Sequence, residues 1–464
     1  LPKAQLAEVI ALSDLKMIFL GKLDAWGDKG EAIPEGVQAI KFPHYQGNAK
    51  ITMGDSWDDL LKIHEPATDR YVPNLDDLWT IKFTSGTTGT PKGVMHNFGM
   101  PALVIENEKR TNWIGLAELD EVTFMSYLPL NHVGERIGVE TSAIAFGGTI
   151  SFAERLETFV YNMQETQPTF FFSVPRIWNK FYLGVVGKIP KKRLDVLLKI
   201  PLIGSFLKNK IRTGLGLRNV EVAATGAAIT PAFLKDFYRQ LGIHLVEAYG
   251  MTEVGGSFTN SPDMNTPSDS VGKVVPFAEI KIDPDTSEIL MKTPYVMMGY
   301  YKNPELTAKV LRDGWLHSGD KGSVDANGFV RVTGRVSDTF KTSKGKYITP
   351  NPSEEALLQN DFIEQVCVVG IGIPQPIALV NLSDIAKEAS RTEVEQSLQD
   401  DLAQLNVPLP NYARISTIVI LEEVWSEANK LLTPTLKVIR GHIDDSFREN
   451  YLSWHEMEEE VVWG

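Results

Sequence analysis

A run rich in glycine and threonine, Phe83-Thr84-Ser85-Gly86-Thr87-Thr88-Gly89-Thr90-Pro91-Lys92-Gly93, follows an alternating segment, Trp79–Phe83. The alternation predicts a strand, and the glycines and hydroxyl side chains predict a loop that offers N–H and O–H donors. Lys92 adds a mobile positive charge, so the loop suits a polyphosphate. It is not a Walker A loop, because Lys92 lies between Pro91 and Gly93 and is not followed by Ser or Thr. A polar hairpin without a ligand is the alternative.

Strands and helices alternate through the first two thirds of the chain, which is typical of a parallel sheet covered by helices. We expect a helix at 156–163 and a strand at Thr169–Val174. A second helix is expected from Thr230-Pro231, as N-cap and first residue, to Gly242, with a strand at His244–Tyr249 after it. This pattern predicts an α/β fold.

Strands become more frequent farther along the chain. Ala278–Ile282 and Glu288–Met291 predict a hairpin, because a turn rich in Asp, Pro and Ser joins them. The last part of the chain contains enough strands and helices for a small α+β domain. We place the boundary near Ser337, which predicts a large domain over 1–336, with a β-rich subdomain, and a small domain over 337–464.

Composition excludes some classes of function. The 464 residues carry a net charge of −13, which argues against general nucleic-acid binding, because such binding needs a positive surface. No apolar run is long enough to span a membrane. The lone cysteine, Cys367, lies in an apolar run, so we expect a buried structural residue. A single cysteine also fits a reducing compartment, and we therefore expect a cytoplasmic protein.

The run 83–93 closely resembles the phosphate-binding signature of the adenylate-forming (AMP-binding) superfamily. This superfamily includes acyl-CoA synthetases, firefly-type luciferases and peptide-synthetase adenylation domains. Further stretches match it in family order, and the resemblance covers nearly the whole chain. It implies a large adenylation domain and a small mobile C-terminal domain, with ATP and Mg²⁺ as ligands. It also implies contacts to the nucleotide from Thr84, Ser85, Gly86, Thr87, Thr88, Gly89 and Lys92.

Tyr249-Gly250-Met251-Thr252-Glu253 resembles a second family motif. An aromatic ring can stack on a purine, a hydroxyl can reach a phosphate, and a carboxylate can hold Mg²⁺. The resemblance assigns these roles to Tyr249, Thr252 and Glu253. An ordinary strand end before a helix start is the alternative. Upstream, Thr225-Gly226-Ala227-Ala228 resembles the segment that lines the adenine and the acyl carbonyl, which implies contacts from Gly226, Ala227 and Ala228.

One acidic and one basic residue resemble the ribose contacts of the family. Asp320 ends the stretch Gly314-Trp315-Leu316-His317-Ser318-Gly319-Asp320, whose aspartate binds both ribose hydroxyls in the family. A carboxylate suits this task because it accepts two hydrogen bonds. Gly334-Arg335 resembles the second ribose contact. A turn-forming aspartate and a surface arginine are the alternatives.

Lys437, in Leu432–Val438, resembles the lysine of the adenylation half-reaction. A carboxylate that attacks an α-phosphate brings two anions together, and a cation between them stabilises the transition state. His132, in Leu128–His132, resembles the residue that shapes the acyl pocket, with a structural histidine as the alternative.

Three features depart from the family pattern. Ser337 occupies the position at which many members carry Asp or Lys as the hinge pivot, and Asp338 follows it, so both remain candidates. The segment around Gly345 is unusually basic. Only 83 residues precede Thr84, so we expect that part of the N-terminal lobe is missing.

The motifs around His132 and Lys437 look most like the long-chain fatty-acid–CoA ligase branch, which implies a fatty acid and coenzyme A as substrates. The segment from Lys188 to Arg218 combines basic residues with Leu and Ile. Such a segment suits the surface of an anionic membrane, and a solvated helix pair is an equal alternative.

Three functions are therefore considered. The first is an acyl-CoA synthetase that forms acyl-AMP and pyrophosphate and then transfers the acyl group to CoA. The second is an adenylation enzyme that passes the acyl group to a carrier-protein thiol or a reductase. The third is an inactive nucleotide-binding or membrane-bound scaffold, against which the joint presence of Lys92, Glu253, Asp320, Arg335 and Lys437 argues.

Overall fold

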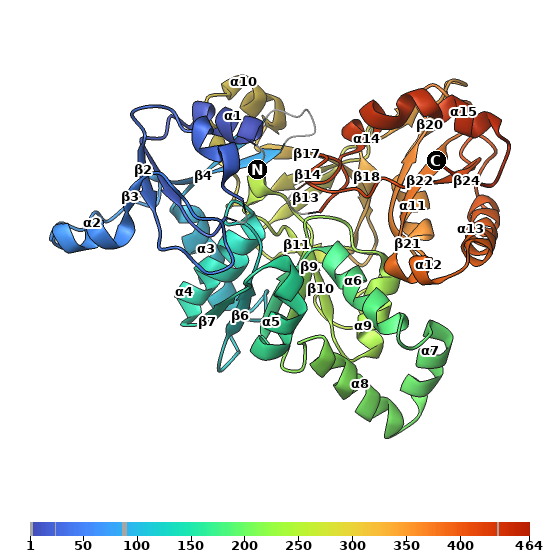
Figure 1. Ribbon diagram of the computed structural model, residues 1–464, viewed down its shortest axis with the longest axis horizontal. Helices are drawn as coiled ribbons and strands as arrows, with labels where there is room; N and C mark the ends of the chain where they lie inside the picture. Colours follow the sequence, from blue (N-terminus) through green and yellow to red (C-terminus); the bar gives the residue numbers. More distant parts are fainter. Residues whose placement is uncertain (1–2, 24, 86–90, 434–435) are drawn as a thin grey trace.

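The computed structural model describes residues 3–23, 25–85, 91–433 and 436–464 (Figure 1). It is a mixed α/β structure with a large N-terminal domain and a smaller C-terminal domain, which confirms the predicted fold class. No helix in these ranges is long and apolar enough to cross a membrane.

A five-stranded parallel sheet lies at the centre of the large domain, in the order β10-β9-β8-β6-β7. Helices α5, α6 and α9 pack on it through a core rich in aromatic side chains, including Phe171, Trp178 and Tyr238. The carboxyl ends of β9 and β10 open into the region where parallel sheets usually bind ligands. The elements are β6 (Thr123–Ser126), β7 (Thr149–Phe152), η3 (Leu156–Thr158), α5 (Phe159–Thr166), β8 (Phe170–Ser173), α6 (Pro175–Val186), α7 (Lys191–Lys199), α8 (Ile203–Gly214), β9 (Val222–Gly226), α9 (Ala232–Gln240) and β10 (Leu245–Ala248).

The predicted N-cap of α9 is wrong. The residue that caps this helix is Pro231, and no side chain caps it. Thr230 is instead fixed by tertiary contacts: its hydroxyl lies 3.0 Å from that of Thr225, and its N–H donates to Glu247. A buried carboxylate on the neighbouring strand therefore determines the conformation of Thr230.

Antiparallel sheets form a second part of the large domain. β4 (Leu78–Ser85) and β5 (Pro91–Asn97) form a hairpin, to which β15 (Gly299–Tyr300) adds as a third strand. The predicted hairpin of β13 (Glu279–Ile282) and β14 (Glu288–Lys292) is present. It belongs to a sheet in the order β13-β14-β17-β16, with β18 beside β17. Those strands are β16 (Leu311–Arg312), β17 (Trp315–Val324) and β18 (Val330–Arg335).

The N-terminal part adds a small parallel sheet, β1-β2-β3. The remaining elements of the large domain are α1 (Lys3–Ser13), β1 (Met17–Leu20), η1 (Gly27–Ala32), β2 (Gln38–Lys41), β3 (Asp55–Ser56), α2 (Trp57–Ile63), α3 (Gly99–Thr111), η2 (Gly134–Thr141), α4 (Ser142–Phe146), η4 (Thr252–Val254), β11 (Thr259–Asn260), β12 (Lys273–Val274) and α10 (Pro304–Val310).

The small domain is built on a four-stranded sheet, β21-β22-β23-β24, in which only the first pair is antiparallel. Cys367 of β21 is fully buried, as expected. The elements are β19 (Phe340–Lys341), β20 (Tyr347–Ile348), α11 (Asn351–Leu357), β21 (Ile363–Val369), β22 (Ile377–Leu382), α12 (Asp384–Glu388), α13 (Arg391–Asn406), β23 (Ile418–Ile420), α14 (Arg440–Phe447), η5 (Arg448–Asn450), α15 (Tyr451–Glu456) and β24 (Val461–Trp463).

Polar contacts join the small domain to helix α6 of the large domain. Arg176 Nη2 lies 2.9 Å from Glu364 Oε1, and both side chains are largely buried. The hydroxyl of Tyr182 donates to Asp361 Oδ1 over 2.6 Å. These contacts fix one orientation of the small domain, in which residues around Lys437 reach the carboxyl ends of β9 and β10.

Candidate active site

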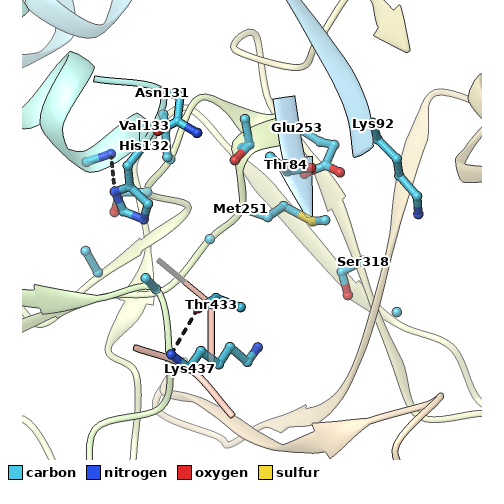
Figure 2. Close-up of a pocket in the computed structure, with 18 of the residues that line it drawn as sticks. Thr84, Lys92, Asn131, His132, Val133, Met251, Glu253, Ser318, Thr433 and Lys437 are labelled. Atoms are coloured by element: carbon cyan, nitrogen blue, oxygen red, sulfur yellow. Dashed lines mark hydrogen bonds between the residues drawn. The ribbon is translucent and has the colours of Figure 1, made fainter. Parts of the chain in front are cut away.

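A cavity of about 1140 Å³ lies between the β4–β5 hairpin, the end of β10 and the part of the small domain around Lys437 (Figure 2). Elements far apart in the sequence contribute to its wall. The predicted site residues that line it are Thr84, Lys92, Ala227, His132, Thr252, Glu253, Arg335 and Lys437.

Thr84 and Lys92 face each other in the register of the hairpin, just before and after the predicted phosphate loop. The strand pairing therefore brings the Lys92 side chain beside the cavity. Ser85 is the last residue of β4. The predicted contacts Gly86, Thr87, Thr88 and Gly89 lie outside the described residues.

Glu253 is largely buried and lines the cavity near Thr84 (Figure 2). The Tyr300 hydroxyl donates to its Oε1 over 2.7 Å, and the Lys92 ammonium lies 5.9 Å from the centre of the Tyr300 ring. Burial, together with the Glu253 charge, raises the pKa of Tyr300, so its hydroxyl stays protonated and keeps donating. Tyr300 thus orients the carboxylate and also contacts the lysine.

A single carboxylate near Thr84 and Lys92, which border the predicted phosphate loop, has the chemistry that Mg²⁺ needs, because this ion is usually held by one or two carboxylates together with phosphates and water. Among the described residues, no group of three or more His, Cys, Asp or Glu side chains is arranged to hold a metal ion by itself. Glu253 is the predicted metal ligand, and the structure places it in the wall of the cavity.

A second cavity, of about 450 Å³, adjoins the first. Ala228, Tyr249 and Asp320 line it, and Ala227, Arg335 and Lys437 line both cavities. Gly226 lines neither of the two. It ends β9 at a close approach, since a Cβ at this position would lie 2.7 Å from the Ala248 carbonyl oxygen.

Asp320 is held in a fixed orientation by two partners. The Tyr249 hydroxyl donates to its Oδ2 over 2.9 Å, and Arg335 Nε lies 3.1 Å from its Oδ1. Burial and the Asp320 charge keep the pKa of Tyr249 well above its ordinary value, so the hydroxyl remains a donor. The sequence motifs at 249, 320 and 335 therefore meet at one carboxylate.

Lys437 lies in a narrow loop at the junction of the two cavities. Leu432 and Val438 form a β-bridge, the Lys437 N–H donates to Thr433 Oγ1 over 3.0 Å, and the Thr433 N–H donates to the Lys437 carbonyl. Pro434 and Thr435 of this motif lie outside the described residues. Figure 2 shows the side chain extended along the cavity.

Burial among the surrounding protein groups lowers the pKa of Lys437 to about 8, and the nearby Arg335 guanidinium adds to this effect. The side chain keeps an exposed surface, because it faces the cavity. Because this lowered pKa still lies above 7, most Lys437 side chains are charged at neutral pH, and the charge is lost in mildly alkaline solution.

His132 lies on the opposite side of the cavity and accepts a hydrogen bond from the Gly134 N–H at Nδ1 over 3.2 Å. Its ring stacks with Phe172 at a centroid distance of 6.3 Å. Burial lowers the pKa of His132 to about 4, so the ring is neutral at pH 7. The hydrogen bond assigns the remaining proton to Nε2, which makes this histidine a donor into the cavity without a charge.

Sequence reasoning missed Tyr300 and Arg440. Nothing in the sequence around Tyr300 links it to Glu253, because the contact depends on β15 joining β5. Arg440 lines both cavities, pairs with Glu354 at 2.6 Å and approaches Asp338 at 4.0 Å. The signal that could have identified Arg440 is its position three residues after Lys437.

Comparison with known proteins identifies the family to which this α/β architecture belongs. The profile of the AMP-binding enzyme family matches residues 1–301, and that of the AMP-binding enzyme C-terminal domain matches residues 337–451. The chain therefore belongs to the AMP-binding enzyme family.

Two curated relatives are long-chain acyl-CoA synthetases. Long chain acyl-CoA synthetase 5 of Arabidopsis thaliana is 30% identical over 68% of this chain and 53% of its own length. Long-chain-fatty-acid–CoA ligase 5 of Rattus norvegicus is 31% identical over 84% of this chain and 64% of its own length. The chain thus spans less than two thirds of either relative.

Among solved structures, the A domain of a carboxylic acid reductase from Segniliparus rugosus, in complex with AMP and a co-purified carboxylic acid, is similar with a TM-score of 0.81. The sequence identity is 21%, and the match covers 99% of this chain and 78% of that chain. Because the identity is low, this similarity is evidence for the fold alone.

Proposed function

We propose that the protein is an ATP-dependent acyl-CoA synthetase for long-chain fatty acids, which forms acyl-AMP with release of pyrophosphate and then a CoA thioester with release of AMP. The observation that carries this proposal is the convergence of Lys92, Glu253 and Lys437 on one cavity, next to the fixed carboxylate of Asp320. These are the chemical groups that adenylation of a carboxylate requires.

In the proposed first half-reaction, Asp320 accepts hydrogen bonds from the ribose hydroxyls of ATP, and Tyr249 and Arg335 hold it in position. Thr84, Thr252 and Lys92 bind the phosphates. Mg²⁺, held by Glu253, would neutralise phosphate charge when bound. Lys437 binds between the attacking carboxylate and the α-phosphate, where negative charge accumulates.

The acid is proposed to enter the apolar part of the large cavity. Val104, Ile114, Ile137, Phe172 and Val222 line this part. An apolar lining favours an acid with a hydrocarbon tail, because transfer of apolar surface out of water is favourable. The neutral His132 at its entrance can donate a hydrogen bond to the acid without attracting a second anion.

The second half-reaction is proposed to need another orientation of the small domain, with the boundary at residue 337. In the present orientation the small domain presents Lys437 to the cavity, while the contacts of Arg176 and Tyr182 hold it on α6. Gly345 is exposed on a different loop of the same domain. Rotation about a hinge is the usual way to exchange two such loops at one site.

An adenylation enzyme that passes the acyl group to a carrier-protein thiol or a reductase is the second candidate. The similarity to the A domain of a carboxylic acid reductase supports it. Both candidates share the first half-reaction and differ in the acceptor of the acyl group.

Pyrophosphate release across a panel of acids, measured with and without CoA, tests the proposal. We expect ATP- and Mg²⁺-dependent release with long-chain acids and AMP release that requires CoA. Release without any CoA-dependent thioester would favour the second candidate. No acid-dependent pyrophosphate release from a folded protein would contradict both and leave the scaffold function.

A further inference from the structure

Helices α7 and α8 form an arm at the edge of the molecule, away from the proposed active site (Figure 1). One face of this arm packs on the core of the large domain through Leu194, Leu198, Leu207 and Ile211. A close turn joins the helices: a Cβ on Gly204 would lie 2.4 Å from the Leu198 carbonyl oxygen. The arm is therefore a compact, anchored unit.

The outer face of the arm is apolar. Leu202 is 85% exposed, Phe206 70%, Val196 62% and Ile203 50%. These side chains fall within eleven consecutive residues, at and beside the turn between the helices. Single exposed apolar residues are ordinary, but a cluster at the tip of a projecting element marks a contact surface.

Basic residues are concentrated in the segment that carries this apolar tip. Residues 188–218 contain nine Lys or Arg and one acidic residue, a net of +8, in a chain whose total charge is −13. Lys199 and Lys210 are exposed and flank the tip. Because the rest of the chain is strongly acidic, this concentration of positive charge orients the arm toward a negative surface.

We propose that the α7–α8 arm docks the protein on the surface of an anionic lipid bilayer. Exposed Leu202 and Phe206 insert between headgroups, and the lysines and arginines of the same segment contact lipid phosphates. Apolar residues with a rim of basic residues are the combination that interfacial membrane binding requires. A protein partner with an acidic surface would explain the charges, but not the exposed apolar side chains at the tip, which line neither of the two cavities described above.

Sedimentation of the full chain with vesicles tests this proposal. We expect binding to vesicles of phosphatidylcholine and phosphatidylserine, weak binding to phosphatidylcholine alone, and loss of binding in high salt, which shortens the Debye length to about 3 Å at 1 M. The double variant Lys199→Gln/Lys210→Gln should bind roughly 30-fold more weakly, at about fivefold per charge. The matched control Lys16→Gln/Lys50→Gln, on exposed lysines of the N-terminal part, should bind like the wild type.

The variant Leu202→Ser/Phe206→Ser tests the apolar contribution and should weaken binding at least about tenfold. Leu202 has a φ of +66°, a conformation in which glycine would relieve backbone strain. Serine is therefore chosen as the replacement, because it removes the apolar side chain without that second effect. Circular dichroism would verify folding.

Equal binding to both vesicle types, or wild-type binding by the Lys199→Gln/Lys210→Gln variant, would overturn the proposal. The proposal would also be overturned if the wild-type protein did not bind vesicles but self-associated, and if Leu202→Ser/Phe206→Ser abolished that self-association. Because ATP and acid are absent, the result is independent of the proposed activity.

Discussion

Replacement of Lys437 by alanine should slow acyl-AMP formation and spare thioester formation from supplied acyl-AMP. Only the first half-reaction brings two anions together at this lysine. A unit charge pair at 4 Å contributes about 4 kcal/mol at an effective dielectric constant of about 20. Solvent in the cavity screens part of this, because the Lys437 side chain is exposed there. We therefore expect a loss of about 10²–10³-fold in the first half-reaction.

The pH profile gives this prediction a second readout. With a pKa of about 8, Lys437 is charged in about ten of eleven molecules at pH 7 and in about one of eleven at pH 9. The rate should therefore fall as pH rises through 8, since the charged form is the active one. The relevant constant is kcat/KM for ATP, which reports the free enzyme. Lys437→Arg should move the fall to higher pH.

Both half-reactions are assayed separately, by pyrophosphate release and by thioester formation from acyl-AMP. Lys430→Ala, a second exposed lysine lining the same cavity, is the matched control. Equal loss of both half-reactions in Lys437→Ala would refute the reasoning and indicate a structural lysine. If Lys437→Arg left the fall of kcat/KM at alkaline pH unchanged, the titrating group would be another residue.

Three further predictions concern the metal, the ribose and the hinge. Glu253→Gln should raise the Mg²⁺ requirement about tenfold or more, because an amide is a weaker ligand for a hard cation; an unchanged Mg²⁺ titration would remove Glu253 from the metal site. Tyr249→Phe should raise the KM for ATP about tenfold with little change in kcat, since Asp320 loses a hydrogen bond to its charged group. An unaltered KM would show that this contact does not serve binding. Ser337→Pro should slow one half-reaction more than the other, because proline fixes φ near −65°. Wild-type rates for both in a folded variant would exclude Ser337 as the pivot and make Asp338 the next position to test.

The sequence predicted the residues of the site that belong to compact motifs. Tyr249, Thr252 and Glu253 lie at the end of one strand, and Asp320 lies on another, so short stretches identify them. The structure brings them together at adjoining cavities, although their catalytic roles remain proposals. Short motifs identify these residues because the residues of one motif are close in sequence and share one local conformation.

Contacts made across the fold could not be predicted in the same way. Tyr300 meets Glu253 only because β15 joins the edge of β5, some 200 residues earlier in the chain. Thr230 has the residue type of an N-cap, but the amide of Thr230 donates to Glu247 on the neighbouring strand. Local propensity predicted a capping hydroxyl in that case, and tertiary packing gave Thr230 different contacts.

The buried thiol of Cys367 makes the chain convenient for spectroscopy. Cys367 is the only cysteine, is fully buried and has a pKa that burial raises above its ordinary value, so it should react slowly with maleimides and iodoacetamides. A pair of cysteines introduced at exposed sites, one on each domain, would therefore carry fluorophores with little background labelling. Energy transfer between the two dyes could then record the orientation of the small domain during turnover, in a protein whose native residues are otherwise unchanged.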